Sequence, residues 1–290
     1  MYIHSLQYYE DWIRTHYFNR SHWNEITSVG WQTFSSPWRP SVREVSVYKK
    51  FIDKIKPRSV LVLGSTPEIR DILATLEEKV VISDFSLHMI QQMSELMKTS
   101  KRFEVWQVEN WLNITRSENM YDLVIGDLTL RLIDFNKQEK LLEIICKILK
   151  KNGSCILREH YVDNTMYNIS FEKLSRELYN ICKLTLSLDK KSDLIMSLLF
   201  DSFIDRKHHR VDEGKLYSYL RQTIEKTSGR NHDILQYTFR KWGTYFNYTQ
   251  LTKNELEQKF NNIFEMHEIY QYAENYRGSF FYPIYWLKKV

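Results

Sequence analysis

Short apolar runs alternate with amphipathic helical patterns between residues 60 and 157, and this alternation constrains the fold more than any other feature of the sequence. The apolar runs cover residues 60–63, 79–83, 104–108, 121–125 and 154–157. The helical patterns between them cover residues 68–76, 86–98 and 137–150. Apolar strands that alternate with helices form a parallel sheet whose two faces are both covered. We therefore expect an α/β fold with a doubly wound, mostly parallel sheet.

The segments on either side of this region extend the prediction. Residues 1 to about 35 form an aromatic-rich helical pattern, and a capping box of Ser41 and Glu44 predicts a further helix that ends at residue 56. Residues 162–258 show helical patterns only. Residues 264–271 and 279–287 regain strand character around a loop with Asn275 and Gly278. These last two strands predict an antiparallel hairpin at the sheet edge, which completes a seven-stranded sheet.

Polar or turn-forming residues follow four of the predicted strands. In a parallel sheet the carboxyl ends of the strands share one edge, and ligands bind in the crevice outside it. The residues at these ends are Gly64, Ser65 and Thr66 after the first strand, Asp84 after the second, Glu109, Asn110 and Trp111 after the third, and Gly126 and Asp127 after the fourth. We therefore predict that these side chains surround a ligand site.

The types of these residues suit a nucleoside. A carboxylate such as that of Asp84 accepts hydrogen bonds from two vicinal ribose hydroxyls. Phe85 and Met89 can flank a flat adenine ring, and Glu109 or Asn110 can accept from its exocyclic amine. The alternatives are structural, because Asp84 can cap the following helix and Asp127 can cap a loop.

The order of these features resembles class I S-adenosylmethionine-dependent methyltransferases. The likeness covers about residues 40–160 and 262–288, and it includes the sequences YDLVIGD, KNGSCIL and FYPIYWLKK. It implies a Rossmann-like core (41–161 plus 259–290), an N-terminal helical cover segment (1–40) and a helical insertion that serves as a substrate lid (162–258). It also implies S-adenosyl-L-methionine as cofactor, S-adenosyl-L-homocysteine as product, and SN2 transfer of a methyl group to an O, N or C nucleophile.

The first loop departs from the family's usual glycine-rich pattern. It reads LGSTPE, keeps only Gly64, and resembles a subgroup in which a Trp-Arg-Pro segment precedes the core. A sulfonium nucleoside has no pyrophosphate, so the close backbone approach that further glycines permit is not required. Ser65 and Thr66 can bind the cofactor's carboxylate or cap the helix, and Glu68 can attract its ammonium or favour the helix N-terminus. A generic helix start remains the alternative.

Candidate residues for the reaction lie beside the expected cofactor site. Asp127, Glu159 and His160 are candidate bases, and Tyr161 can orient a substrate. The family likeness places Arg39 near the cofactor's carboxylate and Trp38 over the substrate pocket. The alternatives are that proximity alone suffices for methyl transfer and that Trp38 only anchors the N-terminal segment.

The composition of the chain limits the cellular compartment and the classes of binding partner that we expect. Forty-one basic and 36 acidic residues give a net charge of +5 without a basic run, so a nucleic-acid partner is not expected. Three cysteines without a CxxC pair predict a reduced, cytoplasmic protein. The N-terminus lacks the pattern of a signal peptide, and no apolar run is long enough to span a bilayer.

The expected partners are therefore small. We expect a small-molecule or peptide substrate, no metal ion, and a monomer or homodimer. The histidine pair in KHHR has no partner ligands at metal spacing. The alternative functions are an RNA or protein methyltransferase, an NAD-dependent oxidoreductase, and a cofactor-binding module without catalysis.

Overall fold

The structure is a computed structural model of the 290-residue chain. It describes residues 28–76, 79–99, 104–162, 169–242, 248–271 and 279–289. The helical pattern predicted before residue 28 lies outside the described residues, as do Asn275 and Gly278.

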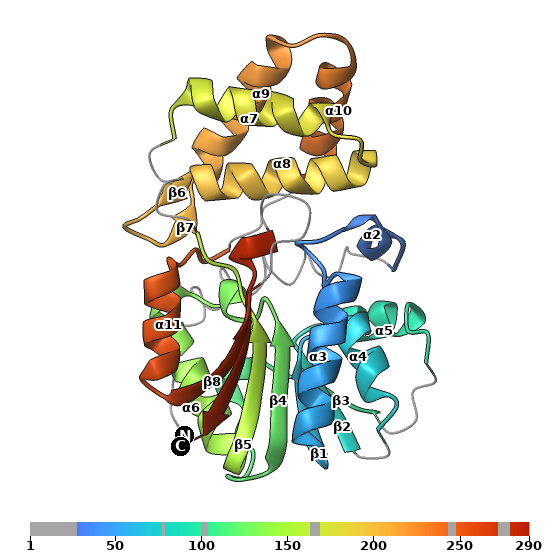
Figure 1. The fold of residues 1–290 in the computed structure, drawn as a ribbon, viewed down its shortest axis with the longest axis vertical. Helices are drawn as coiled ribbons and strands as arrows, with labels where there is room; N and C mark the ends of the chain where they lie inside the picture. The colour runs from blue at the N-terminus through green and yellow to red at the C-terminus, as the bar shows by residue number, and fades with distance from the viewer. Residues whose placement is uncertain are drawn as a thin grey trace, which may run out of the picture.

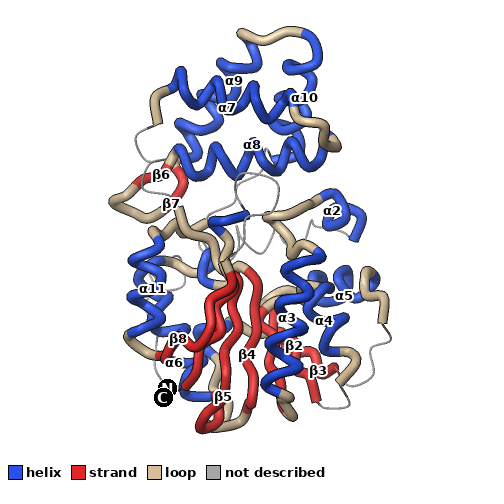
Figure 2. The backbone as a smooth tube through the Cα atoms, in the orientation of Figure 1, coloured by secondary structure: helices blue, strands red, loops and turns tan. Residues whose placement is uncertain are grey.

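A seven-stranded sheet forms the centre of the fold, in the order β3-β2-β1-β4-β5-β9-β8 (Figures 1 and 2). The first five strands are parallel, β9 runs antiparallel to β5, and β8 runs antiparallel to β9. This arrangement confirms the predicted Rossmann-like sheet with its antiparallel hairpin. The strands are β1 (Ser59–Leu63), β2 (Lys79–Asp84), β3 (Glu104–Val108), β4 (Tyr121–Asp127), β5 (Leu149–Arg158), β8 (Phe264–Tyr270) and β9 (Ile284–Lys289).

Helices cover both faces of the sheet because its central strands are apolar on both sides. One face packs against α3 (Val42–Ile55), α4 (Pro67–Leu73) and α5 (Leu87–Glu95), and the other against α6 (Gln138–Ile148) and α11 (Lys253–Asn261). Alternate residues of β1 show the division, since Val60 and Val62 belong to the first core and Leu61 and Leu63 to the second. The predicted capping box at Ser41 is confirmed at the start of α3.

Four helices stand beyond the carboxyl edge of the sheet, at the top of Figure 1. They are α7 (Phe171–Lys183), α8 (Leu188–Ser202), α9 (Glu213–Glu225) and α10 (Gly229–Trp242), with a short hairpin of β6 (Ile204–Asp205) and β7 (Arg210–Val211). Their shared core also takes in Trp38, from the segment between α2 (Ser28–Thr33) and α3. The N-terminal segment and the insertion therefore pack together above the sheet.

Short 3-10 helices lie near the strand ends: η1 (Trp111–Asn113), η2 (Leu130–Leu132), η3 (Phe135–Lys137) and η5 (Ser279–Phe281). The last of these differs from the strand predicted from residue 279, since β9 begins only at Ile284. Pro283 precedes that strand and has no amide hydrogen for the sheet. Helix α11, whose first residues fall in the predicted insertion, packs on the sheet through Leu256 and Phe260.

Candidate functional site

A pocket lies outside the carboxyl ends of β1, β2 and β4. Of the residues predicted for the site, it brings together Trp38, Gly64, Ser65, Thr66, Asp84, Phe85, Met89, Trp111 and Asp127. Its volume is about 80 Å³, well below the roughly 300–1,000 Å³ of small-molecule pockets. Trp31, Trp38 and Tyr248 line it from the N-terminal segment and the insertion. We infer that a ligand of nucleoside size enters only when this cover moves.

The turn after β1 places Gly64 and Ser65 opposite Asp84. Gly64 has φ +96°, a backbone conformation that favours glycine. The Ser65 hydroxyl donates to Asp84 Oδ2 at 2.5 Å, and the Ser86 amide donates to Asp84 Oδ1 at 3.0 Å. Burial raises the pKa of Asp84 to about 6, although these hydrogen bonds lower it in part. Ser86 itself caps α5, so Asp84 is not the cap of that helix.

Aromatic and thioether side chains form the wall beyond Asp84. Phe85, Met89, Met93 and Trp111 all line the pocket. The Trp111 indole donates to the Ser83 carbonyl at 2.9 Å, which fixes the ring. The wall is therefore flat and mostly apolar, as an aromatic heterocycle requires.

Arg39 and Glu68 bind each other at the start of α4. Arg39 Nε donates to Glu68 Oε1 at 2.7 Å, and the guanidinium also forms an ion pair with that carboxylate. Neither residue lines the pocket. Thr66 precedes α4 without a side-chain capping bond, and Pro67 occupies the first turn.

Glu109 and Asn110 also lie outside the pocket lining. Glu109 accepts from the Ser83 hydroxyl at 2.7 Å and pairs with Arg116. Asn110 accepts from the Leu112 amide at 3.0 Å and so caps η1. In this structure both side chains form contacts that hold the loop after β3 in place.

Asp127 lines the pocket, but a buried ion network holds its carboxylate. Arg158 donates to Oδ1 at 2.5 Å and to Oδ2 at 3.0 Å, and it also donates to Glu44 at 3.0 Å. Burial alone would lower the pKa of the Arg158 guanidinium, but Asp127 and Glu44 raise it well above its ordinary value. Burial raises the pKa of Asp127, and Arg158 lowers it only in part, while the two-point contact with Arg158 fixes the orientation of the carboxylate.

Three predicted residues follow β5 and are buried outside the pocket lining. Glu159 accepts from the Leu130 amide at 2.9 Å and so holds η2 in place. His160 lies 3.3 Å from Asp201 and packs on the ring of Tyr282 with centroids 4.5 Å apart. Tyr161 accepts from Gln271 and packs against Phe281 in the sheet core.

Glu159 makes stability depend on pH. Burial raises its pKa to about 8 from 4.5, so the folded state binds a proton more tightly than the unfolded state. Its contribution is fully present below pH 4.5 and is lost as the pH rises through 8, with a slope of at most about 1.4 kcal/mol per pH unit. We expect Glu159→Gln to flatten the fall in unfolding free energy over this window, measured by urea denaturation.

A matched control for Glu159→Gln is Glu143→Gln, at an exposed position of α6. That variant should keep the wild-type slope. The assignment to Glu159 is wrong if the two variants show the same pH dependence.

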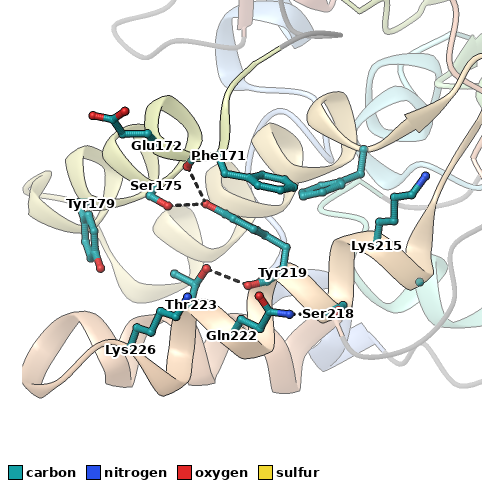
Figure 3. Close-up of a pocket in the computed structure, with 12 residues that line it drawn as sticks. Phe171, Glu172, Ser175, Tyr179, Lys215, Ser218, Tyr219, Gln222, Thr223 and Lys226 are labelled. Carbon is teal, nitrogen blue, oxygen red and sulfur yellow. Dashed lines mark hydrogen bonds between the residues drawn. The ribbon is translucent and has the colours of Figure 1, made fainter.

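A larger groove lies within the insertion, between α7 and α9 (Figure 3). Its volume is about 600 Å³. The Tyr219 hydroxyl lies 2.7 Å from that of Ser175, and the Tyr219 ring stacks on Phe171. No residue predicted for the site lines this groove.

Six pocket residues escaped the sequence prediction: Trp31, Leu63, Met93, Leu128, Leu132 and Tyr248. Leu63 and Leu128 lie at or near the ends of predicted strands, and Leu132 lies further along the loop that contains Leu128, so these positions could have identified all three residues. Trp31 comes from a segment whose contact with the sheet edge has no local signal in the sequence. Tyr248 ends an aromatic segment, residues 240–248, whose composition suits a pocket wall or a packed lid core equally well.

Metal-binding clusters and membrane-spanning helices are both absent from the described residues. No group of three or more His, Cys, Asp or Glu side chains within those residues is arranged to hold a metal ion. None of the helices in the described part of the chain has both the length and the hydropathy needed to cross a bilayer.

Comparison with known proteins shows a shared fold. No protein-family model and no curated protein sequence match the chain. A putative zinc-dependent alcohol dehydrogenase from Rhodobacter sphaeroides is 12% identical, with TM-score 0.58 over 93% of this chain and 98% of its own. A Pyrococcus horikoshii protein is 12% identical, with TM-score 0.52 over 89% and 93%.

An S-adenosylmethionine-dependent methyltransferase from Methanosarcina mazei is 14% identical, with TM-score 0.48 over 80% of this chain and 92% of its own. At such identities the two likenesses with TM-scores above 0.5 show the Rossmann-like fold alone. The activity has to be argued from the residues of the site.

Proposed function

We propose that this protein is an S-adenosylmethionine-dependent methyltransferase whose cofactor binds in the pocket outside β1, β2 and β4. One observation carries the proposal: a single positive-φ glycine, Gly64, and a buried acid, Asp84, converge on a pocket walled by aromatic and thioether side chains. The strand order places this pocket at the carboxyl edge of the parallel strands, where ligands bind in such sheets.

The pocket residues fit this cofactor. Asp84 accepts two hydrogen bonds within the protein, and a carboxylate has about four acceptor positions. It therefore keeps capacity for a ribose hydroxyl. Phe85 and Met89 supply apolar surface for an adenine ring, and Trp38 and Tyr248 add aromatic surface to the pocket lining.

The protein's part in the reaction is alignment and exclusion of water. S-adenosylmethionine, when bound, supplies an electrophilic methyl group for SN2 transfer to an O, N or C nucleophile. Trp31, Trp38 and Tyr248 close the pocket from above and exclude solvent. We propose that Arg158 fixes the Asp127 carboxylate through both of its oxygens, so that this side chain shapes the pocket. Asp127, whose pKa is raised by burial, and His160 both remain candidate bases.

Calorimetry tests the cofactor. We expect S-adenosylmethionine and S-adenosylhomocysteine to bind and NAD not to bind, because residues 65–67 are Ser, Thr and Pro rather than the glycines that admit a pyrophosphate. Absence of binding by both sulfur nucleosides at millimolar concentration contradicts the proposal. Binding by NAD alone favours an oxidoreductase.

The cellular compartment and the methyl-acceptor substrate are two further parts of the proposal. We propose a small-molecule or modified-peptide acceptor in the cytoplasm, supported by the three unpaired cysteines and the mild net charge. A fluorescence titration with RNA that responds only at low salt would instead favour a nucleic-acid substrate. If the protein binds the cofactor but forms no S-adenosylhomocysteine with any acceptor of a panel, the result favours a cofactor-binding module without catalysis.

A further inference from the structure

A buried polar cluster lies next to the cofactor pocket, between the sheet and α8. It consists of Arg131, His160, Asp201, Gln250 and Tyr282, which we call the Arg131 cluster. Each member is at most 7% exposed. The members come from five separate segments that meet beyond the carboxyl ends of β4 and β5.

Many polar atoms of the Arg131 cluster have no hydrogen-bond partner in the described part of the protein. They are Nε and Nη2 of Arg131, both ring nitrogens of His160, Oδ1 of Asp201, and both side-chain amide atoms of Gln250. His160 Nε2 and Asp201 Oδ1 are 3.3 Å apart; burial lowers the pKa of His160, and its contacts with Asp201 and Gln250 offset part of that effect. Each buried unsatisfied group costs about 1–3 kcal/mol. Such a concentration requires an explanation, and a polar ligand would supply the missing partners.

Arg131 is the charged centre of this cluster. Its Nη1 donates weakly to the Tyr282 hydroxyl at 3.4 Å, and no carboxylate of the described residues forms an ion pair with it. Glu159 caps η2, and Arg158 holds Asp127. Arginine is almost never fully buried unless it is paired, so a buried guanidinium without an anionic partner is unusual.

The same guanidinium touches the cover of the cofactor pocket. Its central carbon lies 4.8 Å from the ring centroid of Trp38 and 4.5 Å from that of Tyr248. These two rings also line the cofactor pocket. A movement of Trp38 and Tyr248 would therefore also change the contacts of Arg131.

We propose that the Arg131 cluster binds the carboxylate of the methyl acceptor, so that the substrate is a small carboxylic acid. The planar guanidinium presents paired N–H groups that match a carboxylate. His160 and Gln250 add further hydrogen-bonding atoms, and Trp38 and Tyr248 offer flat surface for an apolar body. A phosphate fits less well, because the cluster offers a single arginine and Asp201 lies 3.3 Å from His160, and a dianion is repelled by that carboxylate more strongly than a monoanionic carboxylate is. This assignment rests on the proposed methyltransferase function.

The test uses benzoate, whose carboxylate is attached to a flat ring, with benzamide and inorganic phosphate as comparison probes. Each is titrated by calorimetry into the full chain, with and without saturating S-adenosylhomocysteine. We expect benzoate to bind more tightly when S-adenosylhomocysteine is present, and benzamide not to bind. Phosphate binding without benzoate binding overturns the carboxylate assignment. No binding by either anion means that the cluster holds only water, and it overturns the proposal.

Two variants locate the binding. Arg131→Met should weaken benzoate binding at least about tenfold, and Arg131→Lys should weaken it less because it keeps the charge without the fork. The matched control is Arg221→Met, since Arg221 also lies over an aromatic ring, that of Phe239, but within the insertion. Unchanged benzoate affinity in Arg131→Lys and Arg131→Met contradicts the proposal. Should Arg131→Met fail to fold, as judged by circular dichroism, Arg131→Lys decides alone.

Measuring S-adenosylhomocysteine affinity on the same samples separates this inference from the proposed function. Benzoate binding that depends on Arg131, without any binding of S-adenosylhomocysteine, refutes the methyltransferase function and leaves an anion site. Binding of S-adenosylhomocysteine without benzoate refutes only the carboxylate assignment.

Discussion

Arg158→Met should destabilise the protein by about 3–5 kcal/mol, because it breaks a buried ion network by removing its only cation. Arg158 is fully buried and donates to both Asp127 and Glu44. Its removal leaves two carboxylates in an apolar interior with no guanidinium to offset their charge. The free energy of unfolding, measured by urea denaturation at pH 7, reports the loss.

The triple variant Glu44→Gln, Asp127→Asn, Arg158→Met serves as the internal control. It removes the two stranded charges along with the guanidinium, so we expect it to recover part of the lost stability. The exposed Arg58→Met, on the loop before β1, should change stability by less than about 0.5 kcal/mol. If Arg158→Met and Arg58→Met are equally stable, the buried network contributes nothing measurable.

Asp84→Ala should weaken binding of S-adenosylmethionine by about 1.5–3 kcal/mol, or roughly 10- to 150-fold. Asp84 is 7% exposed, lines the pocket, and is oriented by Ser65 and Ser86. Removing its carboxylate leaves a ribose hydroxyl without an acceptor. Calorimetric titration of wild type and variant gives the difference directly.

The control for Asp84→Ala is Asp53→Ala. Asp53 is an exposed acid on α3 that pairs with Lys49 and lies outside the pocket lining. It should leave the affinity within about twofold of wild type. Equal losses in the two variants, or unchanged affinity in Asp84→Ala, would remove Asp84 from the ribose site.

Local patterns predicted the sheet well because its strands are continuous apolar runs of the sequence. Val60 to Leu63 form a strand in any parallel sheet that is covered on both faces. The glycine and the acid after β1 and β2 were predicted to meet because parallel strands end at one edge, and the structure places both in one pocket. The hairpin was predicted from the strand character of the last residues together with the family likeness.

The sequence did not predict which charged side chains form ion pairs with each other. Arg39 is predicted near the cofactor, and the structure pairs it with Glu68, a partner that the sequence did not indicate. Asp127 is predicted as a candidate base, and the structure pairs it with Arg158 from the end of the next strand. Ion pairs depend on which side chains lie within a few ångströms after folding, and hydrophobic periodicity carries no information on that distance.

The sequence by itself therefore determined the layers of this protein and the edge at which its candidate pocket lies, since both follow from short-range apolar patterning. Only the tertiary structure decided what covers that edge and what stands beside it. Trp31, Trp38 and Tyr248 line one side of the pocket, and Arg131 and His160 both contact Tyr282 behind it. These residues are far apart in the chain, and the packing of the insertion against the sheet brings them together.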